Sequence, residues 1–169
     1  LSGELPVLML PMDRPRPPVQ THHGLTHNVL LSRSLLDKLN ELSRQEGATL
    51  FMTLLASYQS FLARYTGQTD IIVGSPIANR NYREIEGLIG FFVNTLVYRA
   101  DLSNAPAFQE LLSQVRIKAL KAYEYQDVPF EKIVEVSNLN EIQAILRFSK
   151  PCLLCKIRDR SYQNYMEEI

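Results

Sequence analysis

The sequence contains little of what marks several common functional classes. It has no tryptophan, only two cysteines and only three histidines among 169 residues. Two cysteines cannot form the disulfide framework of a small secreted domain, so we expect a reducing compartment, the cytoplasm. A net charge is also missing, because 18 Lys and Arg residues balance 18 Asp and Glu residues. A general nucleic-acid binder needs a basic excess, and this balance argues against that class.

The sequence also has no long apolar run, no initiator methionine and no leader. No apolar stretch approaches the roughly 20 residues that a membrane-spanning helix requires. Residues 1–5 contain neither a basic segment nor the apolar core of a signal peptide. We therefore expect no membrane partner, and a chain that is a fragment or a domain cut from a longer protein. The hydrophobic fraction of 46% and the charged fraction of 21% are typical of a globular domain.

Residues that could bind metal or act as a base are few and scattered. Cys152 and Cys155 have metal-ligand spacing but supply only two ligands, and the three histidines, His22, His23 and His27, lie far away in sequence. We expect no metal site. A histidine general base also needs an orienting partner, and the sequence suggests none. The histidines are interpreted as a polar entry to a strand, and no catalytic residue is assigned.

The pattern along the chain predicts an α/β domain after a proline-rich start. Residues 6–18 hold five prolines, which predicts an extended linker or a surface strap. Apolar spacing then predicts a strand within 24–32 and a helix that Ser34 caps and Gly47 ends. A second helix follows between Thr49 and Gly67, with Met52, Leu55, Tyr58, Leu62 and Tyr65 on its inner face. The remaining expected elements are a strand at 70–74, a loop at 75–81, a strand at 91–99, a helix from about 106 and a helix after the turn at 126–131.

Two polar segments have both a structural and a functional interpretation. Asn94 lies within an apolar strand, on the face that alternation gives to Phe92, Leu96 and Tyr98. A buried amide has to be hydrogen-bonded, which favours an amide that ties a loop to the strand over one that lines a substrate channel. The turn at 126–131 favours helix capping near Asp127, with Phe130 as an apolar anchor.

Four segments together resemble one family. Residues 5–17 resemble the stretch in the middle of the condensation domains of nonribosomal peptide synthetases. Residues 70–80, ending in Ala78-Asn79-Arg80, resemble the Gly-x-Pro-x-Ala-Asn-Arg segment of that family. Residues 89–99 match its Gly-x-Phe-Val-Asn-Thr motif, and residues 125–131 match its Gln-Asp-x-Pro-Phe-Glu motif. The order and spacing of the segments make the resemblance specific over about residues 1–136.

The resemblance implies a fold similar to chloramphenicol acetyltransferase, with two α/β lobes around a tunnel. This chain would be most of the C-terminal lobe, with a mixed sheet flanked by helices. Residues 1–18 would be the proline-rich inter-lobe segment, residues 19–136 the partial condensation domain, and residues 137–169 a divergent tail. By resemblance, the residues that line the tunnel or support the motifs are Arg80, Gly90, Phe92, Val93, Asn94, Thr95, Gln126, Asp127, Pro129 and Phe130. Arg80 is expected to help hold the lobes together.

The same resemblance implies an amide-forming acyl transfer between two thioesters. The acyl groups arrive on the phosphopantetheine arms of peptidyl carrier domains, and no cofactor is bound directly by the condensation domain. The expected partners are therefore carrier domains and the missing N-terminal lobe. The family's His-His-x-x-x-Asp-Gly motif belongs to that N-terminal lobe. Here His22-His23 follows the proline-rich segment and lacks the Asp and Gly, so it is not taken as that motif.

The tail departs from the family after Val136. Codons can be chosen for residues 144–157 that read, in another frame, Asn-Pro-Pro-Phe-Phe-Lys-Ala-Met-Phe-Ala-Leu-Gln-Asn, which resembles the family's continuation. We interpret the tail as compatible with a frameshift, in which case its cysteine pair is accidental.

Three functions remain open from the sequence. The first is a fragment of a condensation domain that is inactive alone. The second is a non-catalytic lobe that binds a carrier domain or a partner lobe through an apolar face. The third is a stand-alone acyltransferase that uses acyl-coenzyme A, which would require one of the three histidines to act.

Overall fold

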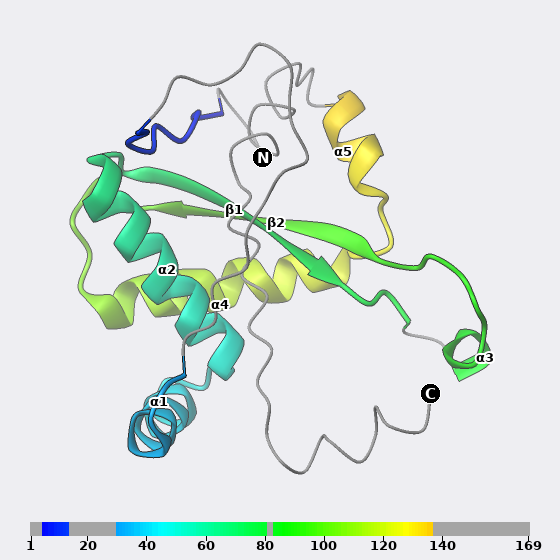
Figure 1. The fold of residues 1–169 in the computed structure, drawn as a ribbon, viewed down its shortest axis with the longest axis horizontal. Helices are drawn as coiled ribbons and strands as arrows, with labels where there is room; N and C mark the ends of the chain where they lie inside the picture. The colour runs from blue at the N-terminus through cyan, green and yellow to red at the C-terminus, as the bar shows by residue number, and fades with distance from the viewer. Residues whose placement is uncertain (1–4, 14–29, 81–82, 137–169) are drawn as a thin grey trace.

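The computed structural model describes residues 5–13, 30–80 and 83–136 (Figure 1). Its elements, in chain order, are α1 (Arg33–Gln45), α2 (Leu50–Thr66), β1 (Asp70–Ile77), α3 (Arg83–Glu86), β2 (Asn94–Asp101), α4 (Phe108–Glu124) and α5 (Phe130–Val136). The strand predicted within 24–32 falls mostly outside the described residues, and Leu30 and Leu31 belong to no helix or strand. The histidines, the two cysteines and the tail from residue 137 also lie outside the described residues.

Capping side chains begin the first two helices close to the predicted positions. The Ser32 hydroxyl, two residues before the predicted cap at Ser34, accepts a hydrogen bond from the Leu35 N–H and caps α1. Thr49 caps α2 as predicted, by accepting from the Met52 N–H. Gly67 ends α2 with φ 73°, in the left-handed region that a glycine adopts without a steric penalty. These caps fix the point at which the chain enters β1.

Within the described residues the sheet consists of two antiparallel strands. Asp70 lies opposite Asp101, and Ile77 lies opposite Asn94. Strand β1 therefore continues through Ser75 and Pro76, where the composition had predicted a loop, because pairing with β2 extends it. Strand β2 starts at Asn94, three residues after its predicted beginning, and ends at Asp101.

Helices cover both faces of this sheet, which confirms the predicted α/β class. Figure 1 shows α2 and α4 on one side of the strands and α5 on the other. The main core lies on the α2–α4 side, and its buried sheet residues are Ile71, Val73, Leu96, Tyr98 and Ala100. On the opposite side, Ile72 packs with Leu5 and Phe130 in a smaller cluster. Through Leu5 and Leu8 the N-terminal segment packs on the lobe, which favours the predicted surface strap over the predicted linker.

The inner face of α2 differs from the prediction at two positions. Tyr65 was predicted on the inner face, but it is 55% exposed and its ring stacks on the ring of Phe61 with centroids 5.5 Å apart. The buried position belongs to Gln59, whose Nε2 donates to the carbonyl oxygen of Tyr98 at 3.1 Å. A search for apolar spacing overlooks a glutamine, although its amide ties α2 to β2.

The end of the sheet away from Asn94 is closed by an ion pair. The Arg99 Nε donates to Asp70 Oδ1 at 2.9 Å, and the Arg99 Nη2 donates to Asp70 Oδ2 at 2.6 Å. This two-point geometry joins the start of β1 to the end of β2. Hydrogen bonding to Asp70 raises the pKa of the Arg99 guanidinium, which stays charged.

Across the described ranges, no helix has the length and apolarity needed to span a membrane.

Candidate functional site

Asn94, the first residue of β2, holds the turn that follows α4. Its Nδ2 donates to the carbonyl oxygens of Gln126, at 2.7 Å, and Val128, at 2.8 Å. Its Oδ1 accepts from the N–H of Phe130 at 3.1 Å and from the N–H of Thr95 at 2.9 Å. The side chain is buried, and both ends of the amide are fully used. This bonding is that of an amide which ties a loop to a strand.

The turn places its own residues in different roles. Phe130 begins α5 and is buried against Ile72 and Leu5. The carbonyl oxygen of Pro129 accepts from the N–H of Lys132 at 3.0 Å and so starts the helix. Asp127 is exposed and makes no hydrogen bond within the described residues, so capping does not come from its side chain. The acceptor for the first helical N–H is Asn94, which lies 36 residues earlier in the chain.

A second cluster forms around Arg80, after the end of β1. The Arg80 Nη1 donates to the carbonyl oxygens of Ile85, at 2.7 Å, and Leu88, at 2.8 Å, and these bonds hold α3 and the loop after it. The guanidinium also lies over the ring of Phe92, 4.3 Å from its centroid. A methyl group added to Gly90 would come within 3.0 Å of the same ring. Gly90 therefore permits Phe92 to lie under Arg80.

Asn79, next to Arg80, adopts a backbone conformation that glycine suits better. Its φ is 51°, and its buried Oδ1 accepts no hydrogen bond within the described part of the chain. We expect Asn79→Gly to raise the free energy of unfolding by about 1 kcal/mol, because glycine has no Cβ to clash in this region. Asn79→Ala is expected to lower it by a similar amount. Urea unfolding followed by circular dichroism measures both, and equal effects of the two variants would contradict the assignment.

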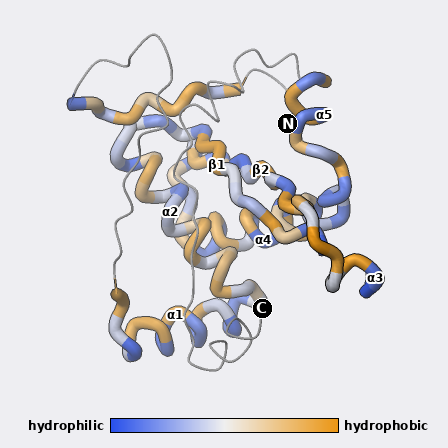
Figure 2. Tube along the Cα trace, turned by 45° about the vertical axis from the view of Figure 1, so that its right-hand side comes forward, coloured by the Kyte–Doolittle hydropathy of each residue, from blue (hydrophilic) through white to orange (hydrophobic). Residues whose placement is uncertain are grey.

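The segment between α3 and β2 exposes a run of apolar side chains. Ile89 is 105% exposed and Phe91 is 90% exposed, and Leu88 and Val93 are each about half exposed. Figure 2 shows hydrophobic colour along this segment where it projects from the rest of the lobe. We call residues 88–93 the apolar loop. Four large apolar side chains in six residues are far more than the scattered exposure of an ordinary surface, and they mark an interaction site.

Acidic side chains near the two clusters, such as Asp127 in the turn and Glu84 in α3, are exposed, and the tyrosines with raised pKa values belong to the main core. Burial raises the pKa of Tyr58 to about 12, and burial followed by the neighbouring Tyr123 raises the pKa of Tyr98. Both tyrosines therefore remain neutral near pH 7 and cannot act as bases. No group of three or more potential metal ligands occurs in residues 5–13, 30–80 and 83–136. The hydrogen bonds at the two clusters position the turn at 126–130 and the segment that includes α3.

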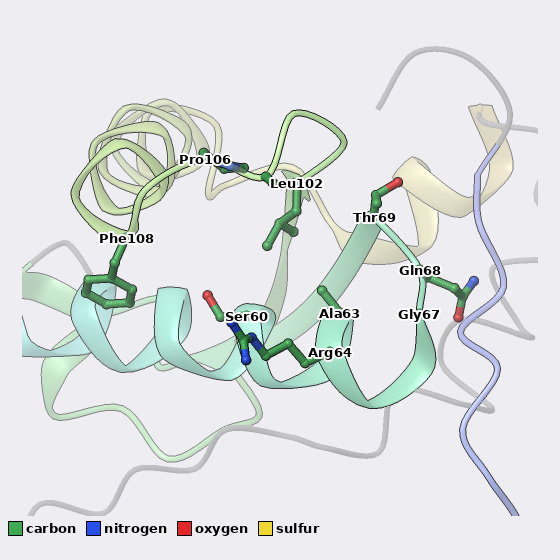
Figure 3. A pocket seen from close by; sticks show the side chains of 10 residues that line it. Ser60, Ala63, Arg64, Gly67, Gln68, Thr69, Leu102, Pro106 and Phe108 are labelled. Atoms are coloured by element: carbon green, nitrogen blue, oxygen red, sulfur yellow. The ribbon is translucent and has the colours of Figure 1, made fainter.

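A cavity of about 470 Å³ lies at the other end of the sheet (Figure 3). Ser60 and Arg64 of α2 line one side, and Leu102, which follows β2, and Phe108, the first residue of α4, line the other. No residue predicted from the motifs lines this cavity. The motif residues therefore gather at the Asn94 end of the sheet, away from the cavity.

The structure brings the motif residues into two groups. Asn94, Thr95, Gln126, Pro129 and Phe130 meet at the start of β2, whereas Arg80, Gly90 and Phe92 meet beside α3. Val93 joins the groups along the chain and is 47% exposed, and Asp127 points to solvent. Gln68, which binds the N-terminal segment, was not predicted from the sequence. The position of Gln68 directly after the helix-ending Gly67 was the only sequence feature that pointed to it.

Comparison with known proteins gives a consistent result. The family model described as "Condensation domain" matches residues 1–161. One of the linear gramicidin synthase proteins of Brevibacillus parabrevis is 62% identical over 135 residues, which are 80% of this chain and 3% of that protein. Surfactin synthase subunit 1 from Bacillus subtilis is 49% identical over 138 residues, 82% of this chain and 4% of that protein. The chain thus spans only a few per cent of the length of these relatives.

Solved structures show the same similarity. The X-domain from teicoplanin biosynthesis superposes with a TM-score of 0.74 at 30% identity, covering 79% of this chain and 30% of that one. The four-domain nonribosomal peptide synthetase holo-AB3403 superposes with a TM-score of 0.72 at 27% identity, covering 75% of this chain and 10% of that one. In each case the chain matches one part of a larger molecule.

Proposed function

Because this chain belongs to the condensation-domain family, we propose that it acts as the C-terminal lobe of a condensation domain in a nonribosomal peptide synthetase. The observation that supports this most directly is that residues of the separate family motifs lie together at one end of the sheet and hydrogen-bond to one another. Asn94 binds the turn at 126–130, and Arg80 organises the apolar loop beside it. In this proposal the motif residues maintain a shaped surface, and the family's histidine base lies on the N-terminal lobe.

The parent reaction joins two acyl groups held as thioesters. The amine of the acceptor aminoacyl group attacks the carbonyl carbon of the donor thioester. The C–S bond breaks, the donor carrier recovers its thiol, and the amine loses one proton as the amide forms. The phosphopantetheine arms of two carrier domains bring both groups in as substrates. Holding two reactants in line supplies on the order of 7–11 kcal/mol of barrier lowering, and a lobe that shapes the tunnel contributes to that effect.

The lobe is proposed to work only with an N-terminal lobe that bears the family's histidine motif. The apolar loop supports a lobe–lobe contact, because Ile89 and Phe91 are almost fully exposed in the described chain. Burying two such side chains in an interface is worth roughly 1.5–3 kcal/mol each. A cytoplasmic location and docking of carrier domains are parts of the same proposal.

Titration of the purified chain with a separate N-terminal lobe tests the proposal. The probe is the N-terminal lobe of the matching condensation domain of the 62% identical linear gramicidin synthase protein, cut before the proline-rich segment. We expect saturable binding by isothermal titration calorimetry. The double variant Ile89→Ser, Phe91→Ser is expected to weaken binding by tenfold or more, because it removes two apolar anchors.

The matched control is Ile117→Ser. Ile117 is 61% exposed on α4, outside the apolar loop, and its substitution is expected to leave the binding constant unchanged. Absence of binding by the unaltered chain, or equal weakening by the control and the double variant, would count against the proposed lobe contact.

A second candidate function is a non-catalytic recruiting lobe. The similar X-domain from teicoplanin biosynthesis has been solved in a complex with OxyB, and that complex covers 76% of this chain at a TM-score of 0.72. A condensation-type fold can therefore bind a protein partner. If this chain binds an added protein such as OxyB when no N-terminal lobe is present, that result would favour the recruiting role.

A further inference from the structure

Gln68 makes two hydrogen bonds to a segment that lies about 60 residues earlier in the chain. Its Oε1 accepts from the backbone N–H of Met9 at 2.7 Å, and its Nε2 donates to the carbonyl oxygen of Val7 at 2.9 Å. The residue itself is held in place, because Gly67 ends α2 and the Gln68 N–H donates to the Thr66 hydroxyl at 3.2 Å. Figure 3 shows the Gln68 side chain directed toward the N-terminal segment.

The two hydrogen bonds lie on either side of Leu8. A side-chain amide that accepts from residue i+1 and donates to residue i−1 imitates the backbone C=O and N–H of one residue in a neighbouring parallel strand. Leu8 between them is buried in the main core. Leu5 is buried on the other face of the sheet, against Ile72 and Phe130. Gln68 therefore binds the backbone on both sides of one apolar anchor, Leu8, while the second anchor, Leu5, lies on the opposite face of the sheet.

Backbone pairing does not hold this segment. Among the described residues, no backbone–backbone hydrogen bond joins residues 5–10 to the rest of the lobe. The apolar contacts of Leu5 and Leu8 are non-directional and tolerate sliding of the chain. Most residues are flanked by a suitable N–H and C=O, so the amide and Leu8 fix the register together: the two directional hydrogen bonds hold the backbone, and this register places Leu8 in the core.

We propose that Gln68 is a positioning residue that fixes residues 5–10 in one register on this lobe. Given the proposed function, this segment is the connection to the N-terminal lobe, and Gln68 sets the direction from which that lobe is attached. The C-terminal lobe thus binds the segment that connects it to the N-terminal lobe, and this segment does not act as a free hinge.

Spin-label distances on the full chain test the proposal. Labels at Met9→Cys and Lys118→Cys report the segment relative to α4, in a background with Cys152→Ser and Cys155→Ser. Labels at Asn40→Cys and Lys118→Cys report α1 relative to α4. We expect narrow distance distributions for both pairs in the parent chain. In Gln68→Ala, the Met9 pair is expected to broaden and the Asn40 pair to stay narrow.

Amide hydrogen exchange measures how strongly the two hydrogen bonds of Gln68 protect the N-terminal segment. Loss of the two hydrogen bonds is expected to speed exchange of the Met9 N–H by about tenfold or more, with no change at the paired amides of β1 and β2. The matched control is Gln45→Ala, which removes an exposed glutamine bonded only to Glu41 on α1. A narrow Met9 distribution in Gln68→Ala, or equal broadening of both pairs, would overturn the proposal.

The variant Gln68→Glu separates hydrogen bonding from packing. A carboxylate of the same shape still accepts from Met9 but cannot donate to Val7, and its second oxygen faces the Val7 carbonyl. Protonation restores the donor. We expect a narrow Met9 distribution at low pH and a broad one above the carboxyl pKa, whereas a role in packing alone predicts no dependence on pH. These measurements need no partner lobe, so their failure is distinct from failure of the proposed function.

Discussion

Replacement of Asn94 by alanine is expected to lower the free energy of unfolding by about 3 kcal/mol, more than any other single polar substitution proposed for this lobe. Three hydrogen bonds between β2 and the turn would be lost, at roughly 1 kcal/mol each. The carbonyl groups of Gln126 and Val128 would lose their donor, and the N–H of Phe130 its acceptor. Urea unfolding at fixed pH measures the change.

A matched control and a charged variant sharpen this prediction. Asn104→Ala makes the same chemical change at an exposed turn residue that has no hydrogen-bond partner within the described chain, and it is expected to change stability by less than about 0.5 kcal/mol. Equal losses in Asn94→Ala and Asn104→Ala would contradict the role of Asn94.

Asn94→Asp is expected to be unstable at neutral pH and to recover at low pH. A carboxylate facing two carbonyl oxygens disfavours its charged form, so its folded pKa would lie above the unfolded value. A group with a raised folded pKa contributes stability below its unfolded pKa and loses it as the pH rises through the folded pKa. The stability difference between this variant and the parent chain should therefore shrink toward low pH.

The second large effect concerns turnover. The purified chain, mixed with a donor-loaded and an acceptor-loaded carrier domain, is expected to form the amide no faster than the two carriers do without it. The proposed function places the family's histidine motif on the N-terminal lobe, so this chain is expected to lack the base that accepts the proton of the acceptor amine. Liquid chromatography with mass spectrometry of the carrier-bound products measures the rate.

The histidines provide the control for this experiment. A stand-alone acyltransferase would need His22, His23 or His27 as its base, and it would turn over acyl-coenzyme A as well. We expect the parent chain and a variant with all three histidines replaced by alanine to give the same background rate with either donor. A rate that falls on removing the histidines would revive the acyltransferase alternative.

The sequence was sufficient to predict α1, α2, α4 and α5, because local signals determine them, whereas the short α3 was not predicted. Thr49, Gly67 and the apolar spacing of α4 act within one or two turns of chain. The strand limits were less accurate, since pairing between β1 and β2 carries β1 through Ser75 and Pro76. Tyr65 was predicted on the inner face of α2 but is exposed, and the buried Gln59 was not predicted, because apolar spacing gives no signal for an amide whose partner is the carbonyl oxygen of Tyr98 on β2.

The residues of the candidate site could be predicted from the sequence, but the hydrogen bonds and contacts between them could not. The motifs named Asn94 and Phe130, yet only the fold places the Asn94 oxygen at the first N–H of α5, where Asp127 had been the expected cap. Likewise, the motifs named Arg80 and Phe92 without indicating their stacking. Gln68 had no motif at all, because its partners are backbone groups of a segment 61 and 59 residues away.

The most direct test of the central claim is amide formation after the two lobes are combined. The chain is mixed with the N-terminal lobe from the linear gramicidin synthase protein and with the two loaded carrier domains. If this chain is a C-terminal lobe that works only with a partner, the rate should rise by at least about a hundredfold over either lobe alone, as expected for a completed acid–base and positioning site. Amide formation by the chain alone, or no increase when the lobes are bound to each other, would contradict the account.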